Sequence, residues 1–121
     1  MEIKQLEGLI LKDVRVIKDD PNFGDMILFI TECGKSFRMY HWQDCCEDVS
    51  IKDIVGDLYD LIGKEVIKAE ESSNNGSTHW TSTFTWTYYD ISTINATVTI
   101  SWYGTSNGYY SEEVSFERIN N

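Results

Sequence analysis

The residues best suited to chemistry lie close together, in the run Met-Tyr-His-Trp-Gln-Asp-Cys-Cys-Glu-Asp at positions 39–48. It contains His41, Cys45 and Cys46, and imidazole and thiolate are ligand types that zinc prefers. A structural zinc site takes four ligands, commonly Cys-x2-Cys with a second distant pair, and the chain has one other cysteine, Cys33. Neighbouring residues of a strand also point to opposite faces, so the adjacent cysteines are poorly placed to share one ion. The pattern favours buried, unreactive thiols over a metal site.

A cysteine nucleophile activated by His41 or His79 is a second interpretation of the same residues. Activation needs an electropositive surrounding that lowers the pKa of the thiol. The carboxylates on both sides of Cys45 and Cys46 should raise that pKa instead. We therefore expect no catalytic residue, metal or cofactor. A metal or thiol enzyme that uses His41 with Cys45 or Cys46 is the less favoured alternative.

The length of 121 residues, for a mass of 14.0 kDa, suits one domain over residues 1–121. The N-terminal residues lack the apolar segment of a signal peptide, and no apolar run approaches the roughly 18 residues that span a bilayer. We therefore expect a cytoplasmic protein without membrane contact. Because the cytoplasm keeps thiols reduced and three cysteines is an odd count, we also expect no structural disulfide.

The net charge of the chain limits the classes of molecule that it can bind. Twenty acidic and ten basic residues give a net charge of -10, and a duplex phosphate backbone would be repelled. Residues 41–71 carry nine of the acids and three of the bases, a net charge of -6. This acidity excludes nucleic-acid binding and suits either plain solubility or a basic protein partner.

The surrounding pattern predicts an α+β domain, mainly an antiparallel meandering sheet of six or seven strands with one short helix. The predicted strands cover residues 8–18, 25–32, 35–42, 64–71, 80–93, 94–104 and 109–119, with a short extended piece at 49–51. Alternation in the third strand places His41 in or beside the core. The polar residues 72–79 predict a mobile loop.

The predicted helix follows Asp53 as its N-cap and ends at Gly63. On it Asp53, Asp57 and Asp60 share i, i+4 and i+7 spacing and form an acidic stripe. Such a stripe is a solvated face, a weak divalent-cation site or a surface for a basic partner. The exposed or buried state of the aromatic pair Tyr40 and Trp42 is open; exposed, it would suit a protein contact.

Three motifs carry a family resemblance. They are Met39-Tyr-His-x-Gln-Asp-Cys-Cys-Glu-x-Val, Asp53-Ile-x-Gly-Asp-Leu-x-Asp-Leu-Ile-Gly63 and Trp102-Tyr-Gly-x-Ser-Asn-Gly-Tyr-Tyr-Ser-Glu112. Together with Thr85-Trp-Thr-x-Tyr89, they resemble a family of small acidic proteins encoded by phages and prophages of Gram-positive bacteria. The shared residues also suit fold determinants, with Trp86 and Trp102 expected in the core.

The resemblance extends to phage anti-defence proteins, and it implies a non-enzymatic inhibitor. Its implied partner is a host defence-associated sirtuin, an NAD-depleting antiphage enzyme bound by protein-protein contact. The expected contact residues are Trp42, Glu47, Asp48, Asp53, Asp57, Asp60, Tyr109 and Tyr110. The alternative from another class is a sponge that sequesters a nucleotide signal, for which Arg15, Arg38, Arg118 and seven lysines are available. The oligomeric state is left open.

Overall fold

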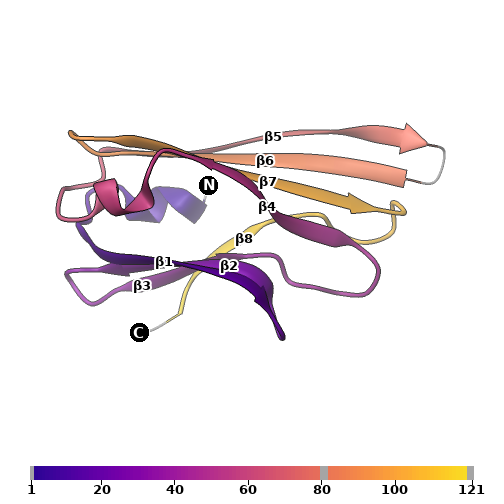
Figure 1. Cartoon of the computed structure of the whole chain (residues 1–121), viewed down its shortest axis with the longest axis horizontal. Helices are drawn as coiled ribbons and strands as arrows, with labels where there is room; N and C mark the ends of the chain where they lie inside the picture. The colour runs from indigo at the N-terminus through magenta and orange to yellow at the C-terminus, as the bar shows by residue number, and fades with distance from the viewer. Residues whose placement is uncertain (1, 80–81, 120–121) are drawn as a thin grey trace.

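The chain folds as two antiparallel β-sheets packed face to face. The computed structural model describes residues 2–79 and 82–119. One sheet has the strand order β1-β2-β3-β8 and the other the order β4-β7-β6-β5. The strands are β1 Leu11–Asp20, β2 Gly24–Thr31, β3 Ser36–Tyr40, β4 Asp48–Val55, β5 Lys68–His79, β6 Ser82–Ser92, β7 Thr97–Ser106 and β8 Ser115–Arg118. Figure 1 shows the two sheets as separate layers, with the β5–β6 hairpin reaching beyond the other sheet at one end.

The core lies between the two layers because the strands alternate apolar residues toward it. Phe29, Phe37 and Met39 from one sheet meet Tyr89 and Trp102 from the other within one cluster of buried side chains. The indole N–H of Trp102 donates to the Met39 sulfur across the layers, at 3.2 Å. The predicted core position of Trp102 is confirmed.

The predicted α+β class is wrong in its helical part, and the described chain is mainly β with eight strands. Strand β4 includes Asp53 and continues to Val55, and the next element is one 3-10 turn, η2, at Leu58–Leu61. Gly56 separates the two at a φ of 100°, a left-handed conformation that interrupts any helix begun at Asp53. The N-cap of η2 is Asp57, whose carboxylate accepts the Tyr59 N–H at 2.9 Å.

The loop predicted over residues 72–79 is a strand instead. These residues belong to β5, which pairs with β6 in one continuous register from Lys68 to Ser77. The Phe84 ring lies directly over Gly76, where an added Cβ would meet the ring at 3.0 Å. Pairing with the Thr- and aromatic-rich β6 supplies the hydrogen bonds and packing that the polar composition of β5 lacks, so the neighbouring strand overrides local propensity.

The structure differs from the predicted elements in two smaller ways, one near each end of the chain. The first turn of the structure is a 3-10 helix, η1, at Glu2–Leu6, which buries Ile3 and Leu6. The strand expected over residues 109–119 is confined to β8, Ser115–Arg118, and Val114 and Phe116 are buried. The residues before β8 form a loop, and this loop contributes to the candidate site.

Candidate protein-interaction surface

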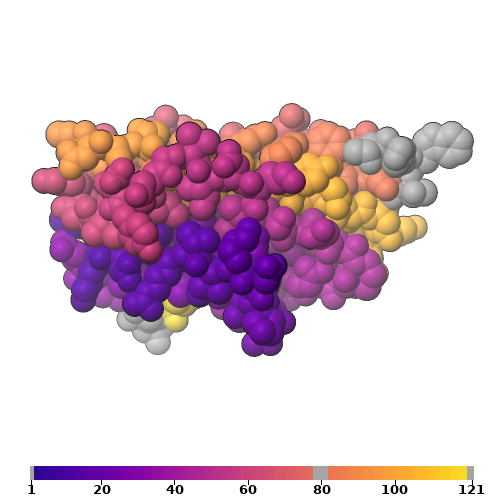
Figure 2. Space-filling model, in the orientation of Figure 1, coloured from indigo at the N-terminus to yellow at the C-terminus, as the bar shows by residue number. Residues whose placement is uncertain are grey.

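Two loops meet at one end of the sandwich. The first covers residues 41–47 and leads into β4, and the second covers residues 107–114 and follows β7. They are neighbours because β4 begins where β7 ends, with Asp48 opposite Thr105 in the pairing register. Figure 2 shows the purple atoms of the first loop beside the yellow atoms of the second. We call this region the loop end of the molecule.

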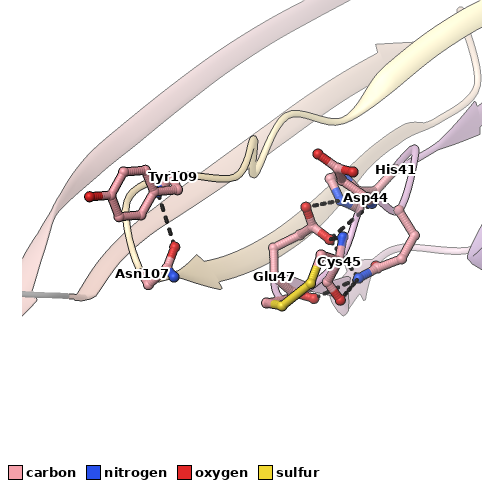
Figure 3. The surroundings of a disulfide bond; sticks show 8 residues. His41, Asp44, Cys45, Glu47, Asn107 and Tyr109 are labelled. Atoms are coloured by element: carbon pink, nitrogen blue, oxygen red, sulfur yellow. Dashed lines mark hydrogen bonds and ion pairs between the residues drawn. A yellow bond between two sulfur atoms is a disulfide. The ribbon is translucent and has the colours of Figure 1, made fainter.

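Glu47 holds the first loop in place from within. Its side chain is buried, with the residue 5% exposed, and its Oε1 accepts the backbone N–H groups of Asp44 and Cys45, each at 3.1 Å. The Gln43 side-chain amide donates to the same oxygen. Figure 3 shows Glu47 beside Asp44 and Cys45. Charge-assisted bonds of this kind compensate the burial of a carboxylate. Glu47, expected at the contact surface, is therefore an anchor beneath it.

His41 ties the two loops together, and its expected position beside the core is confirmed. The residue is 3% exposed, and its Nδ1 lies 2.7 Å from the backbone carbonyl oxygen of Glu113 in the second loop. Since a carbonyl oxygen only accepts, Nδ1 carries the proton in this contact. The other nitrogen, Nε2, faces the Glu47 Oε2 at 3.8 Å. His41 thus bridges the loops rather than facing a substrate.

The cysteines of the first loop differ from both expectations made for them. Cys45 and Cys46 form a disulfide, and both residues are exposed rather than buried. The chain bends at these two positions instead of continuing as a strand, and this brings both sulfurs to the same side. Sulfurs joined in a disulfide are not thiolates, so this pair offers neither a nucleophile nor a metal ligand. Cys33 is free and exposed in the β2–β3 turn, far along the chain from this loop.

Glu112 anchors the second loop, and sequence reasoning missed it. Its carboxylate accepts three hydroxyl hydrogen bonds, from Thr83 at 2.6 Å, Thr85 at 2.7 Å and Ser106 at 2.6 Å. Burial by itself raises the pKa of this carboxyl, but the hydrogen bonds from those hydroxyls and the nearby His41 outweigh it and hold the pKa below its ordinary value. The only sequence signal was the alternate threonines of β6, which place hydroxyls on one face.

The outer side of the loop end is aromatic and acidic. Trp42 is 64% exposed and Tyr109 is 88% exposed, whereas Tyr110 is half-buried. Asp44, Asp48 and Glu113 are exposed as well. A shallow pocket of about 360 Å³ is lined by His41, Trp42, Asp44, Ser111, Glu113 and Ser115. An indole ring next to two carboxylates suits a Lys or Arg side chain from outside, through an ion pair and a cation–π contact.

Trp42 is supported from behind by other rings. Its ring centroid lies 6.2 Å from that of Tyr40 and 6.3 Å from that of Phe23. The Arg38 guanidinium stacks on Tyr40 and Phe23 and pairs with Glu117. Tyr40 is buried and Trp42 is exposed, which answers the open question about this pair. The exposed indole is thus held on a packed base.

The other predicted contact residues lie elsewhere. Asp53, Asp57 and Asp60 are exposed, but β4 carries them away from Asp48 toward the opposite end of the sandwich. Asp48 and Asp57 are nine residues apart in the chain, and nine residues of extended chain correspond to roughly 30 Å. The acidic stripe therefore does not exist as one helix face, and the predicted surface divides into two separate regions. Metal binding has no better support: in the described chain no group of three or more His, Cys, Asp and Glu side chains is placed to hold an ion.

The cations required by a nucleotide sponge are already engaged in part. Arg15 donates to Asp13 at 2.9 Å, and Arg38 is paired with Glu117. Arg118, at the end of β8, is exposed. These positions do not form one cationic pocket, because the first two face carboxylates of their own chain.

A row of aromatic residues covers the outer face of the second sheet. The rings of Trp86 and Tyr88 stack along β6 with their centroids 6.0 Å apart, and the centroid of the Trp86 ring lies 4.6 Å from that of Tyr103 in β7. Trp86 is half-buried by these neighbours and does not enter the core, contrary to the expectation for it. The reason is the register of β6, which turns Thr87 and Tyr89 inward and leaves the even-numbered residues outside.

Comparison with known proteins gives a family. The model of a domain of unknown function, DUF7448, matches residues 7–116, which is most of the chain. No curated protein and no solved structure gives a significant match. In the described part of the chain, no helix has the length and apolar character needed to cross a bilayer.

Proposed function

The chain belongs to the DUF7448 family, and we propose that it is a non-enzymatic binding protein that acts by contact with another protein through the loop end. The observation that carries this proposal is the exposure of Trp42 and Tyr109 on two loops that are each pinned by a buried glutamate. Aromatic residues of this kind dominate the energy of protein interfaces. Their fixed backbone reduces the ordering cost of binding.

The charge of the surface indicates the kind of partner. Asp44 and Glu113 line the same pocket as Trp42, Asp48 is exposed, and no Lys or Arg lies among residues 41–48 or 107–114. Complementary charge speeds encounter and selects a partner with a basic patch. A buried aromatic contact with an acidic rim is the usual arrangement of a specific interface.

The specific partner in this proposal is a host defence-associated sirtuin, an NAD-depleting antiphage enzyme. It rests on the resemblance of the sequence to phage anti-defence proteins, which goes beyond the family motifs around His41–Cys46, Asp53–Gly63 and Trp102–Glu112. In this proposal the protein acts in the cytoplasm of the host cell. It inhibits the enzyme by binding its inactive conformation more tightly than its active one, which requires no chemistry of its own.

The test compares two ends of the same molecule. Trp42→Ala combined with Tyr109→Ala should weaken binding to the purified sirtuin at least about tenfold, since interface aromatics are typical hot spots. Relief of NADase inhibition should accompany the loss. Tyr59→Ala is the matched control, because Tyr59 is also 64% exposed but lies in η2 at the opposite end.

The outcomes separate the surface from the partner. Unchanged affinity in the double variant would overturn the loop end as the contact surface. Loss of binding in the triple variant Asp53→Ala, Asp57→Ala and Asp60→Ala would transfer the contact to the opposite end. No binding by the unsubstituted protein, in calorimetry with a range of sirtuin concentrations, would reject this sirtuin as the partner.

A further inference from the structure

Strand β5 is the last strand at one edge of the second sheet. The strand order of that sheet ends at β5, and no further strand of the described chain pairs with its outer side. The strand has 12 residues, Lys68–His79, in a register that is uninterrupted from Lys68 to Ser77. Ser72, Ser73, Asn74, Asn75 and Ser77 are all exposed. A regular edge of this length offers a row of backbone donors and acceptors to another strand.

One contact shows which backbone groups face outward. The Ala69 N–H donates to the Glu7 carboxylate at 2.9 Å, so this amide points away from β6. In an antiparallel pair the backbone groups of alternate residues point to opposite sides. Because the register continues without a shift, the N–H and C=O groups of Ser73, Asn75 and Ser77 also point away from β6.

The other three edges of the sandwich are protected against such pairing. Strand β1 has two register shifts, and six of its ten residues are charged. Strand β4 has a shift between Ile51 and Asp53, with Lys52 at the same place. Strand β8 has only four residues. Bulges, charges and short length are the usual devices that prevent edge-to-edge association, and residues 72–77 have none of them, nor a proline.

We propose that a second copy of this chain pairs antiparallel with β5 through residues 72–77. The run is electrically neutral, so the net charge of -10 on each copy places no like charges at the contact itself. Its Ser, Asn and Gly side chains are small and polar, so the run presents backbone groups rather than the side-chain contacts by which a specific foreign strand is recognised. This pairing is independent of the loop end and of the function proposed for it.

The same geometry limits the assembly to two copies. Joining two β5 edges gives a continuous eight-stranded sheet, because each copy contributes four strands. Both outer edges of that sheet are β4 strands, which are protected by their bulge and charges. The two-fold contact therefore closes instead of extending into a fibre. Six residues per copy form a small contact, and we expect a dissociation constant on the order of 0.1–1 mM.

Sedimentation velocity of the full chain over a concentration series tests the proposal. The weight-average mass should rise from 14.0 kDa toward twice that value as the concentration passes the dissociation constant. Ser72→Lys with Asn74→Lys should keep the chain monomeric, because like charges of the two copies then face each other across the edge. The matched control is Asn95→Lys with Thr97→Lys, which adds the same charge at two exposed positions, one in the β6–β7 turn and one at the start of β7. This control should dimerise at least as well as the unsubstituted chain.

Hydrogen exchange provides a measurement that needs no variant. The amides of Ser73, Asn75 and Ser77 should exchange more slowly at high protein concentration, while those of Ser72 and Asn74, already bonded to β6, should change little. A chain that stays monomeric at 1 mM, roughly the upper end of the expected range, would overturn the proposal. So would equal dimerisation of the Ser72→Lys, Asn74→Lys variant, or exchange rates at residues 73, 75 and 77 that do not depend on concentration.

Discussion

Buried carboxylates are the residues that organise this molecule. Asp25, at the start of β2, accepts the backbone N–H of Ile51 in the other sheet at 2.9 Å and the Lys18 ammonium at 2.9 Å. Its second oxygen accepts the Asp19 N–H at 3.1 Å. Glu47 and Glu112 do the same for the two loops of the candidate surface. Each carboxylate replaces several water contacts by fixed donors. Asp25 and Glu112 thereby join segments that are distant in sequence, whereas Glu47 fixes the loop just before it.

Removing the Asp25 carboxylate should destabilise the fold. Asp25→Ala leaves the Ile51 N–H without its acceptor, and we expect a loss of about 2–4 kcal/mol in the free energy of unfolding. Urea denaturation followed by tryptophan fluorescence measures this loss. Asp53→Ala, an exposed position on β4, should change the stability by less than about 0.5 kcal/mol. Equal effects of the two substitutions would contradict the role of Asp25 as a link between the sheets.

The same carboxylates should make the fold sensitive to acid. Burial alone would raise the pKa values of Asp25 and Glu112 in the folded state. Hydrogen bonds outweigh burial and lower both pKa values below their ordinary values, and the nearby Lys18 charge for Asp25 and His41 for Glu112 act in the same direction. Folded pKa values below the unfolded ones contribute stability that is present above the unfolded pKa and is lost as pH falls through the folded pKa. The unfolding free energy should therefore decline from about pH 5 downward.

A substitution identifies the source of this acid sensitivity. In Glu112→Gln the group no longer titrates, so the decline of stability with falling pH should be shallower than in the unsubstituted chain. Urea unfolding at several pH values between neutral and acid measures the slope. An unchanged slope would show that Glu112 contributes nothing to it.

At the scale of elements, glycines decide where strands end and how closely loops approach. Gly56 ends β4 at a φ of 100°, and this single residue replaces the expected helix by a strand and a 3-10 turn. Gly104 has a different role, in the middle of β7. An added Cβ there would lie 2.8 Å from the Val49 Cγ2 and 3.1 Å from the Glu112 Cβ. The second loop can pack against β7 only because Gly104 has no side chain.

Gly104→Ala should therefore disturb both the β4–β7 pair and the second loop. We expect a loss of about 1–3 kcal/mol in stability, as for other overpacked sites. Thr105→Ala, the next residue on the opposite face of β7, is the control and should cost less. Thermal unfolding compares the two, and the amide signals of residues 107–112 in NMR should shift in the glycine variant alone.

For the whole molecule, the charge of -10 governs approach to a basic partner. The association rate with the proposed partner should fall about tenfold or more from low to high ionic strength, while the dissociation rate changes little. Stopped-flow mixing at several salt concentrations measures both. The double substitution Asp44→Asn with Asp48→Asn should make the association rate depend less steeply on salt concentration. A salt-independent association rate would contradict electrostatic steering toward the loop end.

Part of this architecture follows from the sequence alone. Alternation predicted a mainly antiparallel sheet and His41 beside the core, because the two-residue period of a strand is a local property. The α+β class was wrong in its one short helix, which is a 3-10 turn. The exposed carboxylates expected at Asp48, Asp53, Asp57 and Asp60 are found, whereas the one expected at Glu47 is buried. These features depend on neighbours within a few residues.

The tertiary structure decided the rest. Strand β5 exists because β6 pairs with it, Glu112 is an anchor because hydroxyl donors from the distant strand β6 converge on it, and β4 separates Asp48 from Asp57. The two-sheet arrangement places the loops at residues 41–47 and 107–114 side by side, although some sixty residues separate them in the chain. Long-range pairing sets which polar groups are buried, and no local pattern encodes it.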